Sequence, residues 1–157
     1  MVSPGPRKIL VAEDNASIRN ILAFLLRQRG YEVLESGDGD EALEKALTLR
    51  PDLVLLDVMM PGKTGLEICS ILKGNEAYRD IRIVILTAAT KDSGKDDAYW
   101  RRISNADDFI SKPFQGTDLV QRIERALGPE ARRETRSLRT SHYEISSTED
   151  EASEDAR

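Results

Sequence analysis

The stretch Leu53-Val54-Leu55-Leu56-Asp57, followed directly by Val58-Met59-Met60-Pro61-Gly62, decides the fold of this 157-residue chain. Four consecutive apolar residues without polar alternation are typical of a parallel strand that is covered by helices on both faces. The aspartate that closes the run places a charge at the end of a buried strand, where it needs a partner or a chemical task. We therefore expect a central strand with a functional carboxylate at its carboxyl end.

Other apolar runs alternate with amphipathic segments between residues 7 and 128. The runs predict strands at Ile9-Leu10-Val11, Val33-Leu34, Ile83-Val84-Ile85-Leu86 and Phe109-Ile110. Apolar residues at helical spacing predict helices within residues 18–26, 42–47, 66–72 and 119–127, and a weaker pattern predicts a short helix within 91–105. This alternation implies right-handed crossovers and an α/β fold with a doubly wound, five-stranded parallel sheet. We expect the flavodoxin-like strand order 2-1-3-4-5 with five flanking helices.

Polar residues follow the predicted strands at the edge where ligands bind in such folds. They are Glu13 and Asp14 after the first strand, Asp57 after the third, Thr87 after the fourth and Lys112 after the fifth. Crowded carboxylates repel one another unless a cation lies between them, and hard oxygen ligands suit Mg²⁺, with Mn²⁺ as the alternative. The sequence therefore predicts a metal site at this edge.

Each of these residues also has an ordinary structural interpretation. The acidic pair could lie in a solvated loop, with Asp14 or Asn15 as the N-cap of the first helix. Thr87 could be a simple strand-end hydroxyl and Lys112 a surface charge. Their occurrence together at strand ends favours the functional interpretation.

The chain resembles the response-regulator receiver domain over residues 7–128, in a single-domain form similar to chemotaxis regulators. The resemblance rests on Glu13-Asp14, on Asp57 within residues 55–62, on Gly65, on Thr87-Ala88 and on the run Ala106-Asp107-Asp108-Phe109-Ile110-Ser111-Lys112-Pro113-Phe114. Each motif is weak alone, but the motifs in this order, each at its own strand end, are specific.

The resemblance implies a phosphorylation switch of two-component or phosphorelay signalling in bacteria. Asp57 would accept the phosphoryl group from a histidine kinase or a histidine phosphotransfer protein. The acidic pair, Asp57 and the backbone carbonyl of Met59 would hold Mg²⁺, and Lys112 would supply further positive charge. Such a protein catalyses only its own phosphorylation and dephosphorylation and is not a metabolic enzyme. The alternative is a degenerate receiver that binds partners without being phosphorylated.

The response to phosphorylation is also implied by the resemblance. The Thr87 hydroxyl would bind a phosphoryl oxygen, and Phe109 would move between exposed and buried positions. Phe109 could instead be a plain strand hydrophobe, since buried aromatic residues are common. The Lys112-Pro113 bond resembles the family's cis peptide. Output would pass through contacts with an unidentified downstream protein.

Two rival enzymes are disfavoured by single positions. Gly62-Lys63-Thr64 imitates the end of a phosphate-binding loop, but Asp57 stands where that motif needs a glycine. A phosphatase with an aspartate nucleophile would need a second aspartate at position 59, which is Met59.

Composition limits the setting and the partners. A formal net charge of −5 argues against direct binding of nucleic acid, which needs a basic face. With no long apolar run and no signal-peptide pattern, we expect a cytoplasmic protein without membrane insertion. Cys69 is the one cysteine and is predicted to be a small core residue. Residues 1–6 are expected to be a flexible lead, and the polar residues 129–157 a disordered tail.

Overall fold

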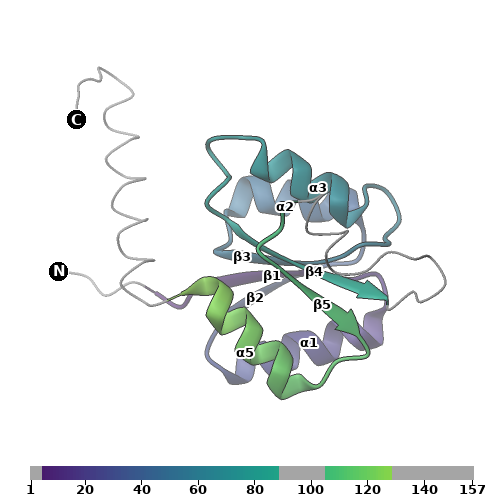
Figure 1. Cartoon of the computed structure of the whole chain (residues 1–157), viewed down its shortest axis with the longest axis vertical. Helices are drawn as coiled ribbons and strands as arrows, with labels where there is room; N and C mark the ends of the chain where they lie inside the picture. The colour runs from purple at the N-terminus through teal and green to yellow at the C-terminus, as the bar shows by residue number, and fades with distance from the viewer. Residues whose placement is uncertain (1–4, 89–104, 129–157) are drawn as a thin grey trace. The chain divides into compact units, whose positions relative to one another are not determined.

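Five parallel strands form one sheet in the order β2-β1-β3-β4-β5 in the computed structural model, which describes residues 5–88 and 105–128 (Figure 1). The strands are β1 (Lys8–Ala12), β2 (Glu32–Ser36), β3 (Leu53–Asp57), β4 (Arg82–Ala88) and β5 (Asp108–Lys112). The predicted doubly wound sheet and its strand order are confirmed.

Four helices of the described residues cover the sheet. They are α1 (Ala16–Gln28), α2 (Gly39–Leu49), α3 (Gly65–Lys73) and α5 (Gly116–Leu127). Figure 1 shows α1 and α5 on one face and α2 and α3 on the other. The helix predicted within 91–105 falls almost entirely outside the described residues, as do the tail 129–157 and the first four residues of the lead. No helix of the described part has the length and apolarity needed to cross a membrane.

The central position of β3 follows from its side chains. All five residues of β3 are buried. Leu53 and Leu55 belong to the apolar cluster with α1 and α5, whereas Val54 and Leu56 belong to the cluster with α2 and α3. Because the residues of a strand point alternately to opposite faces, a continuous apolar run supplies both layers.

Polar side chains cap the N-termini of α1, α2 and α3 close to the ends of the preceding strands. The Asn15 side chain caps α1 and the Asp38 side chain caps α2. Thr64 and Glu67 form a reciprocal capping box at the start of α3. Each cap satisfies backbone N–H groups that have no partner inside the helix. The chain therefore turns sharply after β1 and β3, which leaves their last residues at the edge of the sheet.

Candidate functional site

Three carboxylates meet where β1 and β3 end. One oxygen each from Glu13, Asp14 and Asp57 can be chosen so that all lie within 4.8 Å of one another. The predicted acidic residues are therefore brought together, and we call these three residues the acidic cluster.

Lys112, the last residue of β5, bridges two members of the cluster. Its Nζ lies 2.8 Å from Oε1 of Glu13 and 3.1 Å from Oδ2 of Asp57. Burial acts to lower the pKa of Lys112, but its hydrogen bonds to the two carboxylates outweigh burial and raise the pKa above its usual value. The lysine therefore stays charged, and its surface-charge interpretation does not fit this structure.

Glu13 and Asp14 differ sharply in exposure. Glu13 is only 1% exposed, whereas Asp14 is exposed. Burial raises the pKa of the Glu13 carboxyl, and the hydrogen bond from Lys112 opposes that rise. The second carboxylate oxygen of Glu13 accepts the Asn15 N–H at 3.1 Å. Asn15 is the N-cap of α1, so the acidic pair is not needed for capping.

Asp57 is held by the loop that follows it. Its Oδ1 accepts the N–H of Met59 at 3.3 Å. The N–H of Gly65 donates to the carbonyl of Val58 at 3.0 Å, which folds the start of α3 back on the end of β3. A Cβ added to Gly65 would lie 2.4 Å from the Asp57 carbonyl oxygen, so only glycine permits this approach. Met59 is 71% exposed. The role of its carbonyl as a metal ligand stays a prediction.

The charges of the site do not balance among its own side chains. Three carboxylates face one ammonium, which leaves a net charge of −2 when all four groups are ionised. Carboxylates this close repel one another unless a cation is shared between them. A hard divalent cation with oxygen ligands matches both the charge and the donor atoms.

Thr87 and Phe109 lie on the neighbouring strands β4 and β5. Thr87 is 4% exposed and comes one residue after Leu86, which is in register with Asp57. Phe109 is fully buried in the apolar cluster with α2 and α3, as its strand-hydrophobe interpretation requires. Its movement stays a prediction. The Lys112–Pro113 peptide bond is cis, as expected.

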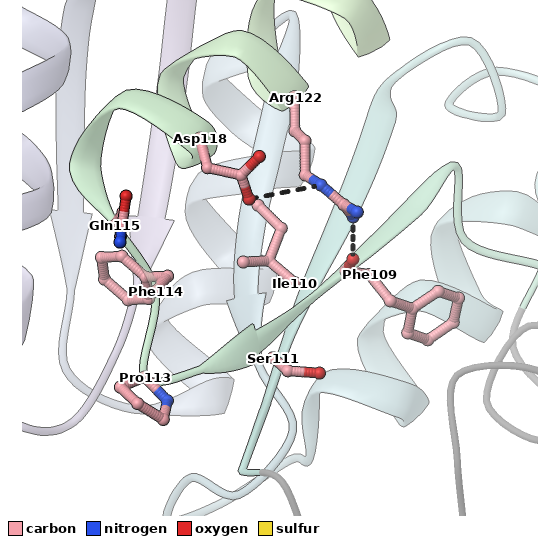
Figure 2. A pocket seen from close by; sticks show the side chains of 8 residues that line it. All are labelled: Phe109, Ile110, Ser111, Pro113, Phe114, Gln115, Asp118 and Arg122. Atoms are coloured by element: carbon pink, nitrogen blue, oxygen red, sulfur yellow. Dashed lines mark hydrogen bonds and ion pairs between the residues drawn. The ribbon is translucent and has the colours of Figure 1, made fainter.

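A separate cavity of about 440 Å³ lies between β5 and α5 (Figure 2). Its lining consists of Phe109, Ile110, Ser111, Pro113, Phe114, Gln115, Asp118 and Arg122. Figure 2 shows Arg122 directed at the Phe109 backbone, where its Nη1 donates to the carbonyl oxygen at 2.6 Å. None of the acidic cluster lines this cavity. The cluster is the stronger candidate for chemistry, because three carboxylates and one ammonium converge there.

Arg19 of α1 contacts the site but was not singled out in the sequence. Its Nη1 donates to the carbonyl oxygen of Glu13 at 2.8 Å. The available signal was its position, because a cation in the first turn of a helix is disfavoured by the helix dipole unless an acceptor compensates.

A protein-family model described as the response regulator receiver domain matches residues 9–124. The DNA-binding response regulator MtrA of Mycobacterium tuberculosis H37Rv is 40% identical over 121 residues, which cover 77% of this chain and 50% of that protein. The phosphate regulon transcriptional regulatory protein PhoB of Escherichia coli K12 is 40% identical over 122 residues, covering 77% of this chain and 52% of that protein. The chain spans about half the length of these relatives.

Solved structures show the same fold. The chemotaxis response regulator CheY4 of Vibrio cholerae has a TM-score of 0.68 at 32% identity, over 77% of this chain and 98% of that chain. The receiver domain of a sensor histidine kinase from Pseudomonas aeruginosa PAO1 has a TM-score of 0.69 at 26% identity, over 80% of this chain and all of that chain. That second structure was solved with a magnesium ion coordinated in its active-site cleft.

Proposed function

This chain belongs to the response regulator receiver family, and from that membership we propose that Asp57 is its phosphoryl acceptor. The donor is a phosphohistidine on a histidine kinase or a histidine phosphotransfer protein. A carboxylate oxygen of Asp57 attacks phosphorus, and the bond from phosphorus to the histidine nitrogen breaks with its electrons left on that nitrogen. The product is a carboxylate–phosphate anhydride on Asp57 and a free histidine on the partner.

Lys112 supports the transfer through its position. Phosphoryl transfer depends mainly on alignment and on neutralising charge that spreads over the transferring oxygens. The Lys112 ammonium lies 3.1 Å from Oδ2 of Asp57, on the carboxylate that would be phosphorylated. Its raised pKa keeps the ammonium charged through the reaction.

Glu13, Asp14, Asp57 and the backbone carbonyl of Met59 would hold Mg²⁺. The observation that carries this proposal is the net charge of −2 left by three converging carboxylates and one ammonium. When bound, the ion offsets negative charge on the phosphoryl oxygens and aligns them with the acceptor. The magnesium-bound cleft of the Pseudomonas aeruginosa receiver supports the same choice of cation.

Thr87 and Phe109 would report the modification to a partner protein. Thr87, buried at the end of β4, donates its hydroxyl to a phosphoryl oxygen once one is attached to Asp57. Phe109 on β5 is in register with Ile85 of β4, so a shift of β4 changes the packing around the aromatic ring. Because the Thr87 contact forms only with the phosphoryl group present, it shifts the population from the unphosphorylated conformation toward the phosphorylated one. Downstream proteins would bind the surface that differs between these two conformations.

Incubation with acetyl phosphate and Mg²⁺ tests the acceptor, with intact mass as the readout. We expect one phosphoryl adduct on the wild type and none on Asp57→Asn. Asp52→Asn is the matched control, because Asp52 is also a buried aspartate beside β3. It lies at the opposite end of β3 from Asp57, where its side chain accepts the backbone N–H of Lys8. Adducts on both the wild type and Asp57→Asn, or on neither, contradict the proposal. Absence of an adduct together with unchanged partner capture by Asp57→Asn would instead support the phosphorylation-independent adaptor.

A further inference from the structure

Arg19 ties the end of β1 to α1 and β2. Its Nη1 donates to the Glu13 carbonyl at 2.8 Å, and its Nε lies 3.5 Å from Oε1 of Glu35. A Cβ at Gly37 would lie 3.2 Å from Arg19 Nη1, so the glycine leaves room for the guanidinium. The arginine stands in the first turn of α1, where the helix dipole disfavours a cation. The two acceptors therefore compensate an otherwise unfavourable position.

The Glu13 backbone is fixed from two sides by these contacts. Its N–H donates to the Ser36 carbonyl at 3.0 Å, and its carbonyl accepts from Arg19. Glu13 is 1% exposed, so loss of the guanidinium would leave a buried acceptor without this donor. The turn between β1 and α1 would then have to shift to bring water to that carbonyl.

We propose that Arg19 is a positioning residue for the acidic cluster. By holding the Glu13 carbonyl, it keeps the turn in the conformation that places the oxygens of Glu13, Asp14 and Asp57 within 4.8 Å of one another, and so sets the affinity for Mg²⁺. The inference rests on the proposed function, because it assumes that the cluster binds this ion. Residues that orient metal ligands in this way contribute strongly to metal affinity although they do not touch the metal.

Charge and position predict opposite effects of removing Arg19. A positive charge beside a cation site weakens cation binding. If Arg19 acted only through its charge, the protein would therefore bind Mg²⁺ more tightly once Arg19 is replaced by a neutral residue. If Arg19 positions the turn, the protein would instead bind Mg²⁺ more weakly after the same change. The sign of the change in affinity therefore separates the two explanations.

Arg27 provides the matched control. Arg27 Nη2 lies 3.1 Å from Oε2 of the same Glu35 and donates to the Val33 carbonyl at 3.2 Å. Like Arg19, it anchors α1 through an ion pair with Glu35 and a hydrogen bond to a backbone carbonyl, but that carbonyl belongs to Val33 of β2 rather than to Glu13. Replacing it weakens the attachment of α1 to β2 while leaving the Glu13 carbonyl bond in place.

The experiment measures Mg²⁺ binding to the full chain by isothermal titration calorimetry, for the wild type, Arg19→Met, Arg19→Lys and Arg27→Met. We expect the dissociation constant to rise roughly tenfold in Arg19→Met. Arg19→Lys, which keeps a donor for the carbonyl, should recover part of the affinity, and Arg27→Met should bind as the wild type does. Circular dichroism in parallel establishes that each variant is folded, and Arg19→Lys carries the test if Arg19→Met does not fold.

Unchanged or tighter binding by Arg19→Met overturns the inference, as does an equal loss in Arg27→Met. If only Arg19→Lys folds, unchanged binding by that variant overturns it in the same way. Absence of Mg²⁺ binding by the wild type is a different failure, because it overturns the proposed metal site itself and the inference with it.

Discussion

The Lys112 ammonium donates to the buried Glu13 carboxylate at 2.8 Å, although 99 positions separate the two residues along the chain. The bond joins the end of β5 to the end of β1 across the strands between them. Lys112 also contacts Asp57, so a single cation contacts two of the three carboxylates of the acidic cluster.

Replacement of Lys112 by methionine should destabilise the fold near neutral pH. The change leaves the Glu13 carboxylate buried without its ammonium, and we expect a loss of roughly 1–3 kcal/mol, below the value for a fully buried pair because the Lys112 side chain is 22% exposed. Urea denaturation measures the loss. The loss of stability caused by Lys112→Met should be smaller in acid, where Glu13 becomes protonated. Lys63→Met, which removes an exposed pair with Asp40, should change stability by less than about 0.5 kcal/mol.

The raised pKa of Glu13 predicts that Mg²⁺ stabilises the protein in a pH-dependent way. A carboxyl whose pKa is higher in the folded state contributes stability that is fully present below its unfolded pKa of 4.5 and is lost as the pH rises through the folded value. Mg²⁺ bound at the proposed site would offset that loss when the carboxylate is ionised. At about ten times the dissociation constant, we expect stabilisation of about 1.4 kcal/mol near neutrality. Less stabilisation is expected near pH 5, because protons compete with the ion.

Thermal unfolding with and without Mg²⁺ at the two pH values measures this effect. Glu13→Gln is the control, since it removes the titrating ligand and should flatten the pH dependence. Equal stabilisation of the wild type at both pH values would contradict the role of Glu13.

The sheet and the position of the site were predictable because their signals are local. The apolar run that ends in Asp57 identified a central strand, and parallel strands bring their carboxyl ends to one edge. The convergence of Asp57 with Glu13 and Lys112 followed from strand order alone. Little tertiary detail was needed for either conclusion.

The different environments of Glu13 and Asp14 could not be predicted from adjacent positions in the sequence. Glu13 is buried because the Ser36 carbonyl, Arg19 and Lys112 all bind it, and these partners come from three other segments. The same limit applies to Asp107. Its carboxylate accepts the Ile83 N–H at 2.7 Å and lies 2.9 Å from Lys73 Nζ, contacts that exist only after the sheet has formed.

Cys69 should be unreactive in the folded protein. The residue is fully buried, and burial raises the pKa of its thiol to about 12, so the nucleophilic thiolate is almost absent near neutral pH. We expect negligible alkylation by iodoacetamide in native buffer and complete alkylation in denaturant, measured by intact mass. Rapid modification of the native protein, at the rate seen in denaturant, would mean that α3 opens readily.

Gly65→Ala should damage both stability and phosphorylation. The added Cβ would lie 2.4 Å from the Asp57 carbonyl oxygen, so α3 or the end of β3 must move. We expect a loss of about 1–3 kcal/mol in urea denaturation and slower adduct formation with acetyl phosphate. Gly5→Ala, where no atom lies within 4 Å of the added Cβ, should behave as the wild type. An unaltered Gly65→Ala variant would show that the loop after Asp57 is more adaptable than its contacts indicate.

Arg122 should protect the outer edge of the sheet. β5 is an edge strand, and the Phe109 N–H donates to Asp108 Oδ1 at 2.8 Å. The Phe109 carbonyl accepts from Arg122 at 2.6 Å (Figure 2). The Arg122 guanidinium also lies 3.3 Å from Asp108 Oδ1, so the two side chains take the place of a neighbouring strand.

Arg122→Met removes the donor to the Phe109 carbonyl and should cost about 1–2 kcal/mol, because a charge-assisted hydrogen bond to a half-buried strand is lost. Hydrogen exchange of the β5 amides should accelerate in this variant, since the strand is then held mainly by β4. Arg125→Met, on the same helix, is the control and should leave β5 exchange unchanged. Equal exchange rates in Arg122→Met and the wild type would mean that pairing with β4 and the burial of Phe109 are sufficient to hold the strand.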